Sequence, residues 1–199
     1  MPKLLLATGN QHKQGELKIL LKSIPYELVT PLELGIDDRV KEIGYTLEEN
    51  AALKATTFAA RSHLLSLADD SSLEVAALDG EPGVFSSRYA GENANDDDRI
   101  NFLLSKLEEI PKEKRQAKFR CVIAIASPQG RIDLCSGECK GFILFTPSGK
   151  EGFGYDPVFY LPQLGKTMAE LSLTEKNRIS HRGRAAAKAH SVLLNMIGG

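Results

Sequence analysis

A short apolar run that leads into two adjacent carboxylates is the feature that most constrains this chain. Residues 67–75 read LADDSSLEV, so that Asp69 and Asp70 stand where a strand would continue. Two neighbouring acids repel each other and resist burial, and a strand tolerates them where a metal ion or a basic ligand neutralises them. A polar turn, in which an aspartate caps a backbone amide, is the alternative that this stretch alone leaves open.

Size and charge exclude several classes of protein. A chain of 199 residues can bury one sizeable core, and we predict a single domain over residues 1–199, with two lobes. The net charge of −1 gives no field that would draw the protein to nucleic acid or to a membrane surface. Its 3 cysteines, with no signal peptide or apolar span, favour a reducing compartment, so we expect a cytoplasmic protein.

The N-terminal residues predict a strand, a tight turn and a helix. Residues 3–7 are apolar, residues 8–10 interrupt them, and Asn10 is a natural N-cap for the leucine-bearing helix that follows. The free amides at a helix start can bind an anion. Lys13 falls in the first turn, where a cation opposes the helix dipole unless a phosphate is bound. A solvated surface lysine is the alternative, and the complete P-loop motif is absent.

A second helix begins at a capping box formed by Thr46 and Glu49. Asn50 and Lys54 are four residues apart on it and therefore share one face. That face is either directed at a ligand or exposed to solvent, and the spacing does not decide between the two.

The second half of the chain predicts hairpins. Residues 119–126, 132–139 and 142–145 read as successive strands, with a turn at residues 128–130. The acidic run at residues 96–98 is most simply the start of a helix. Because helical patterns alternate with strands before residue 119, the predicted class is α/β with a mixed sheet.

Two polar segments near the C-terminus are candidates for ligand binding. In residues 152–157, glycines around Phe153 would let backbone and ring approach a ligand, although a loop anchored by a buried Phe153 is equally compatible. Ser180 is the predicted N-cap of the last helix, so that His181 and Arg182 place two potential cations at a helix start, which again suggests an anionic or oxygen-rich ligand.

Taken together, these segments resemble the inosine triphosphate pyrophosphatase family of house-cleaning purine nucleotide hydrolases. Two residues depart from the family pattern: Ser72 replaces a usual glycine and Ser87 a common alanine. The resemblance covers nearly the whole chain and is carried by Ala7-Thr8-Gly9-Asn10 with Lys13 and Glu16, Glu49-Asn50-Ala51 with Lys54-Ala55, Ala68-Asp69-Asp70-Ser71, Pro82-Gly83-Val84, Ser87-Arg88-Tyr89-Ala90-Gly91, Gly152-Phe153-Gly154-Tyr155-Asp156-Pro157 and Ser180-His181-Arg182.

The resemblance implies an elongated, two-lobed α/β fold with a central substrate cleft, assembled as a homodimer. It implies Mg²⁺-dependent hydrolysis of purine nucleoside triphosphates that carry a carbonyl at position 6 (ITP, dITP and XTP) to the monophosphate and pyrophosphate. Such an enzyme removes deaminated purines from the nucleotide pool.

The resemblance and the chemistry of the groups together suggest roles at the phosphate end. Glu42 and Asp70 are the predicted Mg²⁺ ligands, because Mg²⁺ is usually bound by one or two carboxylates together with phosphate. Asp70 also resembles the family's general base, and Asp69 is a supporting acid. Lys13 and Lys54 would hold the phosphates.

At the base end, Lys176, His181 and Arg182 are donors that suit a carbonyl and leave an amino group unpaired. Phe153 could stack on the purine and Asp156 could fix its other edge. The remaining predicted substrate-binding residues are Thr8, Gly9, Asn10, Gln11, His12, Ser71, Gly154 and Tyr155.

Other functions stay open at this point. A related pyrophosphatase for modified pyrimidines is the nearest rival, and a nucleotide sensor that no longer hydrolyses is a rival from another class. A nucleic-acid-binding module is least favoured, because the charge is balanced and no basic stripe is interleaved with aromatics.

Overall fold

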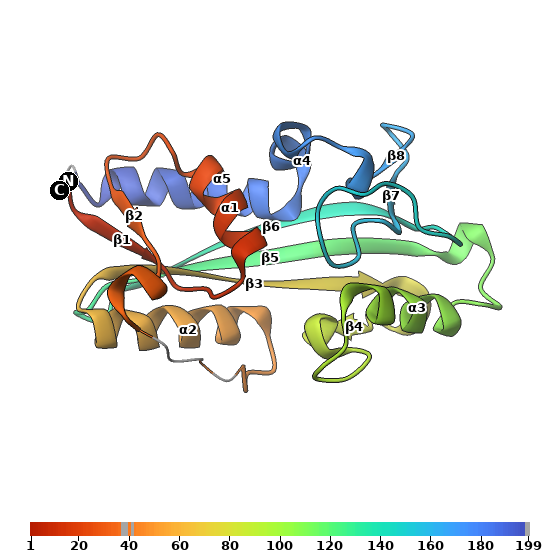
Figure 1. Ribbon diagram of the computed structural model, residues 1–199, viewed down its shortest axis with the longest axis horizontal. Coiled ribbons are helices and arrows are strands. Elements are labelled where there is room, and N and C mark those ends of the chain that lie inside the picture. The colour runs from red at the N-terminus through yellow and green to blue at the C-terminus, as the bar shows by residue number, and fades with distance from the viewer. Residues whose placement is uncertain (37–39, 41, 198–199) are drawn as a thin grey trace. The chain divides into compact units, whose positions relative to one another are not determined.

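The computed structural model describes residues 1–36, 40 and 42–197 of the chain (Figure 1). The helices within these residues are α1 (Gln11–Leu20), α2 (Leu47–Ser62), α3 (Asp96–Lys106), α4 (Leu173–Ile179) and α5 (His181–Asn195). The strands are β1 (Lys3–Leu6), β2 (Glu27–Val29), β3 (Leu65–Val75), β4 (Pro82–Gly83), β5 (Gln116–Ala126), β6 (Ile132–Ile143), β7 (Phe159–Leu161) and β8 (Lys166–Thr167).

The strands form one mixed sheet in the order β2-β1-β3-β5-β6-β7-β8, with β4 paired to β3. β1 runs parallel to both β2 and β3, and its register against β3 pairs Leu4 with Leu65 and Leu6 with Leu67. The pairs β3–β4, β6–β7 and β7–β8 are antiparallel. The combination of parallel and antiparallel pairs gives the mixed α/β class that the sequence predicts.

The chain divides into two compact units. Unit 1 comprises residues 1–70, 121–137 and 182–199, and unit 2 comprises residues 71–120 and 138–181. The boundaries fall inside β3, β5 and β6 and after the first residue of α5, so each of these three long strands contributes to both units. The prediction of one domain with two lobes, an elongated form and a central cleft stays a prediction.

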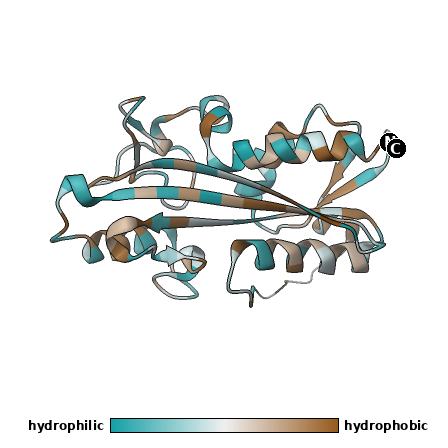
Figure 2. Cartoon of the chain, turned by 180° about the vertical axis from the view of Figure 1, so that it is seen from behind, coloured by the Kyte–Doolittle hydropathy of each residue, from teal (hydrophilic) through white to brown (hydrophobic). Residues whose placement is uncertain are grey.

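Unit 1 has helices on both faces of its part of the sheet. α1 and α5 bury their apolar sides against alternate residues of the strands, among them Leu4, Leu6 and Leu67, in one hydrophobic core. α2 covers the other face (Figure 1) with a side that includes Ala51 and Phe58. The alternation of hydrophilic and hydrophobic residues along α5 is visible in Figure 2 and is the pattern of a helix with one buried side.

Unit 2 has a separate core. Leu73 and Val75 of β3 pack in one cluster with Leu103 of α3 and Phe159 of β7. Tyr155 belongs to the same cluster, so the loop of residues 152–157 is attached to this core. The predicted base-binding residues of this loop are therefore anchored to the core of unit 2.

The helix starts agree with the sequence predictions. Asn10 caps α1, and its side chain accepts a hydrogen bond from the backbone N–H of Lys13. Thr46 and Glu49 form the predicted capping box of α2. A capping box of Asn95 and Asp98 opens α3, which confirms that the acidic run begins a helix.

Two strand predictions need correction. Residues 142–145 do not form a separate strand, because β6 continues without interruption from Ile132 to Ile143. Asp69 and Asp70 lie inside β3, which contradicts the polar-turn alternative. Ser72 also lies inside β3, where its hydroxyl donates to Glu74 at 3.2 Å, so the strand accommodates this serine.

The predicted hairpin turn is confirmed. Ser127 and Arg131 are joined by a backbone hydrogen bond of 2.9 Å, and β5 and β6 are neighbours in the sheet.

Candidate functional site

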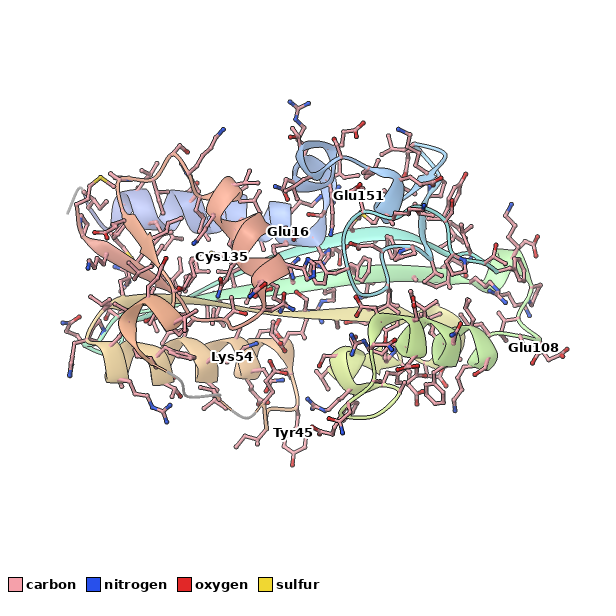
Figure 3. All side chains as sticks on the ribbon, in the orientation of Figure 1. Glu16, Tyr45, Lys54, Glu108, Cys135 and Glu151 are labelled. Atoms are coloured by element: carbon pink, nitrogen blue, oxygen red, sulfur yellow. The ribbon has the colours of Figure 1, made fainter. Side chains whose placement is uncertain are left out.

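The pleat of β3 sends Asp69 and Asp70 to opposite faces of the sheet in unit 1. Successive side chains of a strand alternate between faces, so Asp69 follows Leu65 and Leu67 towards α1 and α5. Asp70 points towards α2. Figure 3 labels one side chain from each of the resulting groups, Glu16 on α1 and Lys54 on α2.

The Asp69 group is a buried network of two acids and two cations. Arg182 donates from Nε and Nη2 to Oδ2 of Asp69 at 3.1 and 3.0 Å, and from Nη1 to Oε2 of Glu16 at 2.6 Å. The ammonium of Lys13 lies 3.1 Å from the same Oδ2 atom. Asp69 is fully buried and the Arg182 side chain is 2% exposed, so these charges are balanced inside the protein.

This network holds Asp69 in its ionised form. Burial raises the pKa of Asp69, but the cations of Lys13, Arg182 and Lys54 outweigh burial and hold the pKa well below its usual range. Burial lowers the pKa of the Arg182 guanidinium, but Asp69 and Glu16 outweigh it and raise that pKa. Asp69 is therefore a fixed anion over the whole physiological pH range.

The Asp70 group gathers two acids around one cation. Lys54 Nζ lies 2.7 Å from Oε1 of Glu42, 3.1 Å from Oδ1 of Asp70 and 2.7 Å from the carbonyl oxygen of Asp69. Asn50, one turn earlier on α2, accepts a hydrogen bond from the N–H of Gly44 at 2.8 Å. The sequence did not decide whether this face of α2 meets a ligand or solvent. In the structure, its Lys54 is directed at the carboxylates of Glu42 and Asp70.

The pKa of Asp70 shifts in the opposite direction to that of Asp69. Burial raises the pKa of Asp70, Lys54 lowers it and Glu42 raises it again, and the pKa ends above its ordinary value. Burial lowers the pKa of Lys54, but the carboxylates of Asp70 and Glu42 outweigh burial and raise it. Two carboxylates that share one ammonium retain affinity for a further cation or for a proton.

The start of α1 is an exposed turn of small and polar residues. Thr8 Oγ1 accepts from the N–H of Asn10 at 3.2 Å, and the side chain of Gln14 donates to the Thr8 carbonyl at 2.7 Å. Gly9, Asn10, Gln11 and His12 are exposed, so a solvent-borne ligand can reach this helix end.

In unit 2, Asp156 organises the predicted base-binding residues. Its Oδ2 atom accepts from Nζ of Lys176 at 2.5 Å and from the backbone N–H of Phe153 at 3.0 Å. The Lys176 ammonium lies 4.8 Å from the centre of the Phe153 ring. Asp156 and Lys176 are both almost completely buried, so this ion pair is a fixed part of unit 2.

The other predicted residues of unit 2 have separate anchors. Tyr155 donates from its hydroxyl to the carbonyl of Ser86 at 2.8 Å. The His181 ring is stacked on Phe119, with ring centres 4.7 Å apart. Ser71 is the first residue of unit 2 and lies half-buried on β3. Gly154 is bonded to α3, as described below.

A protein-family model described as the Ham1 family matches residues 4–192 of the chain. The chain belongs to the Ham1 family. Relatives named dITP/XTP pyrophosphatase include that of Desulforamulus reducens, which is 50% identical over 96% of this chain and 95% of its own length. The one from Geobacter sulfurreducens is 49% identical, with 94% of each chain covered.

Solved Ham1 structures share the fold. The HAM1 protein of Coxiella burnetii has a TM-score of 0.89 and 43% identity, and the match covers 98% of this chain and 100% of that chain. The Ham1 protein of Staphylococcus aureus has a TM-score of 0.87 and 41% identity, with 98% and 99% covered. These matches confirm the family that the sequence motifs resemble.

For this Ham1 chain, the grouping of residues differs from the sequence prediction at one position. Arg182 was predicted with Lys176 and His181 as a donor to the base, but its guanidinium lies in unit 1 on Asp69 and Glu16. His181, its neighbour, belongs to unit 2. A position at a helix start predicts the same role for His181 and Arg182, because it does not specify the direction in which each side chain points.

Two residues that reasoning from the individual motifs gave no role are parts of these groups. Glu16 is the second acid of the Asp69 network. In the sequence it was marked only by its place in a motif of the family. Cys121 Sγ lies 4.0 Å from Oδ2 of Asp69, and the sequence assigned this cysteine no role.

Within the described ranges, no set of three or more His, Cys, Asp and Glu side chains is gathered as a metal site. Glu42 and Asp70 nevertheless supply two carboxylates that converge on one positive charge. This donor set fits Mg²⁺, which is usually held by one or two carboxylates and completes its shell with water and phosphate. No helix in the part of the chain that the structure describes is both long and apolar enough to cross a membrane.

Proposed function

We propose that this chain hydrolyses purine nucleoside triphosphates with a carbonyl at position 6 to the monophosphate and pyrophosphate. The relatives' name, dITP/XTP pyrophosphatase, supports this substrate class. The single observation that carries the proposal is the position of the Lys54 ammonium, which contacts the carboxylates of Glu42 and Asp70 and the backbone carbonyl of Asp69. The cations suit the negative charge of a triphosphate, and the acids suit the metal ion that accompanies it.

Lys13 and Lys54 are the proposed phosphate-binding cations, together with the exposed amides at the start of α1. Lys13 can bind phosphate without leaving Asp69 uncompensated, because Arg182 makes two hydrogen bonds to the same carboxylate. Arg182 is thereby reassigned from the base to the support of Asp69, and Glu16 supports Arg182 in turn.

Glu42 and Asp70 are the proposed ligands of Mg²⁺. When bound, Mg²⁺ would neutralise phosphate oxygens and the charge that develops on the leaving pyrophosphate. Asp70 has a second proposed task, which is to accept a proton from the attacking water. The two tasks compete, because direct coordination to Mg²⁺ lowers the basicity of a carboxylate. The oxygen of that water forms a bond to the α-phosphorus, and the bond from this phosphorus to the bridging oxygen breaks.

Recognition of the base is assigned to unit 2. Lys176 and His181 are the proposed donors to the carbonyl at position 6, Phe153 is the proposed stacking surface, and Asp156 orients Lys176. An adenine base presents an amino group in place of that carbonyl, so a buried donor would lose its acceptor. Sites of this type discriminate by about 10⁴-fold or more.

Pyrophosphate release from a triphosphate panel tests the proposal. The panel contains ITP, dITP, XTP, ATP and a pyrimidine triphosphate, each with Mg²⁺ and with EDTA. We expect turnover of the first three in Mg²⁺ only, with kcat/KM for ATP lower by about 10⁴-fold or more. Equal kcat/KM for ITP and ATP would refute the base selection, and preferred turnover of the pyrimidine would refute the substrate class.

A homodimer and a cytoplasmic location complete the proposal. The three cysteines are buried and form no disulfide bond, which suits a reducing compartment. Analytical ultracentrifugation of the purified protein distinguishes a dimer near twice the 21.7 kDa chain mass from a monomer.

A further inference from the structure

The loop at residues 152–156 in unit 2 is held by carboxylates at two consecutive backbone amides. The N–H of Phe153 donates to Asp156, within the loop itself. The next N–H, that of Gly154, donates to Oδ2 of Asp96 at 2.7 Å, and Asp96 is the first residue of α3. A residue 58 positions away therefore fixes the peptide that follows the proposed stacking side chain.

The loop has a backbone conformation that glycine adopts readily and other residues do not. Gly152 and Gly154 have φ angles of +78° and +63°, in the left-handed region. A Cβ atom at Gly152 would lie 2.1 Å from Oδ2 of Asp156, so the backbone passes directly against that carboxylate. Phe153 stands between these two glycines, and its ring direction depends on which way the peptides on either side of it face.

Asp96 is itself oriented by its neighbours. Its other oxygen, Oδ1, is bonded to the guanidinium of Arg99. Arg99 also donates to the carbonyls of Ser87 and Ala94 at 2.9 and 2.6 Å. The carboxylate thus has one oxygen directed to Arg99 and the other to Gly154, a geometry that a solvated helix-start acid does not require.

We propose that Asp96 is a positioning residue for base recognition, because its bond to Gly154 fixes the direction in which Phe153 meets the purine. The inference rests on the proposed function, in which Phe153 and Asp156 belong to the base site. Removal of the bond should weaken binding of the base and leave the chemistry at the α-phosphorus unchanged.

Asp97 provides a matched control. It is the next residue in the same first turn of α3, it is exposed, and it has the same charge and the same favourable relation to the helix dipole. Asp96→Ala and Asp97→Ala therefore remove the same charge from the same helix end, and only the first removes the bond to Gly154.

The experiment compares kcat and KM for ITP and for ATP in the wild-type chain, Asp96→Ala, Asp97→Ala and Asp96→Asn. We expect KM for ITP to rise about tenfold in Asp96→Ala with kcat nearly unchanged, and the preference for ITP over ATP to fall. Asp97→Ala should match the wild type. Asp96→Asn keeps an acceptor oxygen for the Gly154 N–H and should restore most of the loss.

The amide resonance of Gly154 in ¹⁵N spectra gives a direct readout. It should shift, and exchange faster with solvent, in Asp96→Ala and not in Asp97→Ala. Equal KM, selectivity and Gly154 exchange in the two alanine variants would overturn the inference. Absence of ITP turnover in the wild-type chain would overturn the proposed function instead, so the two failures are distinguishable.

Discussion

Asp69 and Asp70 are consecutive residues of the same type in the same strand, yet the protein gives them opposite properties. Asp69 faces α1 and α5, and receives hydrogen bonds and ion pairs from Arg182 and Lys13. Asp70 faces α2 and shares the ammonium of Lys54 with Glu42. The pKa of Asp69 is held well below its usual range, and that of Asp70 is raised.

The difference comes from the charges that surround each side chain, since both are buried. Lys13 and Arg182 contact Asp69 directly, and the guanidinium makes two hydrogen bonds to its Oδ2 atom. Among the described residues, Lys54 contacts Asp70 and Glu42 together, and the Glu42 carboxylate raises the pKa of Asp70. A carboxylate held in its ionised form by paired cations stabilises a fold, and one whose pKa is raised by burial and a second acid takes up a proton more readily.

The largest effect should come from Asp70→Asn. This variant should lose pyrophosphate release from ITP by about 10³-fold, because an amide cannot accept the proton of the attacking water. The free energy of unfolding should change little, since the variant removes one of two acids that compete for Lys54. Urea titration at pH 7 measures this, and a large loss of stability would contradict the contrast with Asp69.

Asp69→Asn, unlike Asp70→Asn, should lower the free energy of unfolding strongly. Breaking a buried ion pair by removing one partner costs about 3–5 kcal/mol, because Arg182 and Lys13 keep charges that are no longer compensated. The urea midpoint at pH 7 should fall accordingly. If Asp69→Asn and Asp70→Asn destabilise the protein equally, the two carboxylates do not differ in the way described.

The pH dependence of stability sharpens the same contrast. The folded-state pKa of Asp69 lies below its unfolded value of about 3.9, so its contribution is complete above that value and is lost as the pH falls towards the folded-state pKa. The stability difference between the wild type and Asp69→Asn should therefore be constant from pH 7 to pH 5. It should shrink below about pH 4, as urea titrations in EDTA would show.

Lys13→Ala should have a smaller effect, because Arg182 continues to neutralise Asp69. We expect KM for ITP to rise about tenfold, since Lys13 is a proposed phosphate-binding cation, and stability to fall by less than in Asp69→Asn. Steady-state kinetics with ITP measures the first effect. Unchanged kinetic constants would exclude Lys13 from the phosphate-binding groups.

The elements of the fold were largely predictable from local sequence patterns. The caps at Asn10 and Thr46 are encoded within four residues, and the structure contains both. The strand that carries Asp69 and Asp70 was less certain, because two acids in a row also suit a turn. Cations on α1, α2 and α5 neutralise these acids within the strand, and they are distant in sequence.

The partners within the site were harder to predict than its members. Arg182 and His181 look equivalent as cations at a helix start, and the structure separates them between unit 1 and unit 2. Asp96 looks like one of three equivalent acids, and the contact that distinguishes it is with Gly154. The roles of Arg182 and Asp96 depend on side-chain direction and on tertiary contacts. Spacing in the sequence predicts neither of these.

The register of β1 against β3 has a chemical consequence. Leu4 and Leu6 pair with Leu65 and Leu67, and this alignment keeps the odd-numbered residues of β3 on the apolar side. A slip of one residue would turn each side chain to the opposite face. Asp69 and Asp70 would then each face the opposite side of the sheet, so a single insertion or deletion in β3 ahead of them would take both carboxylates away from their present cations even if the strand still formed.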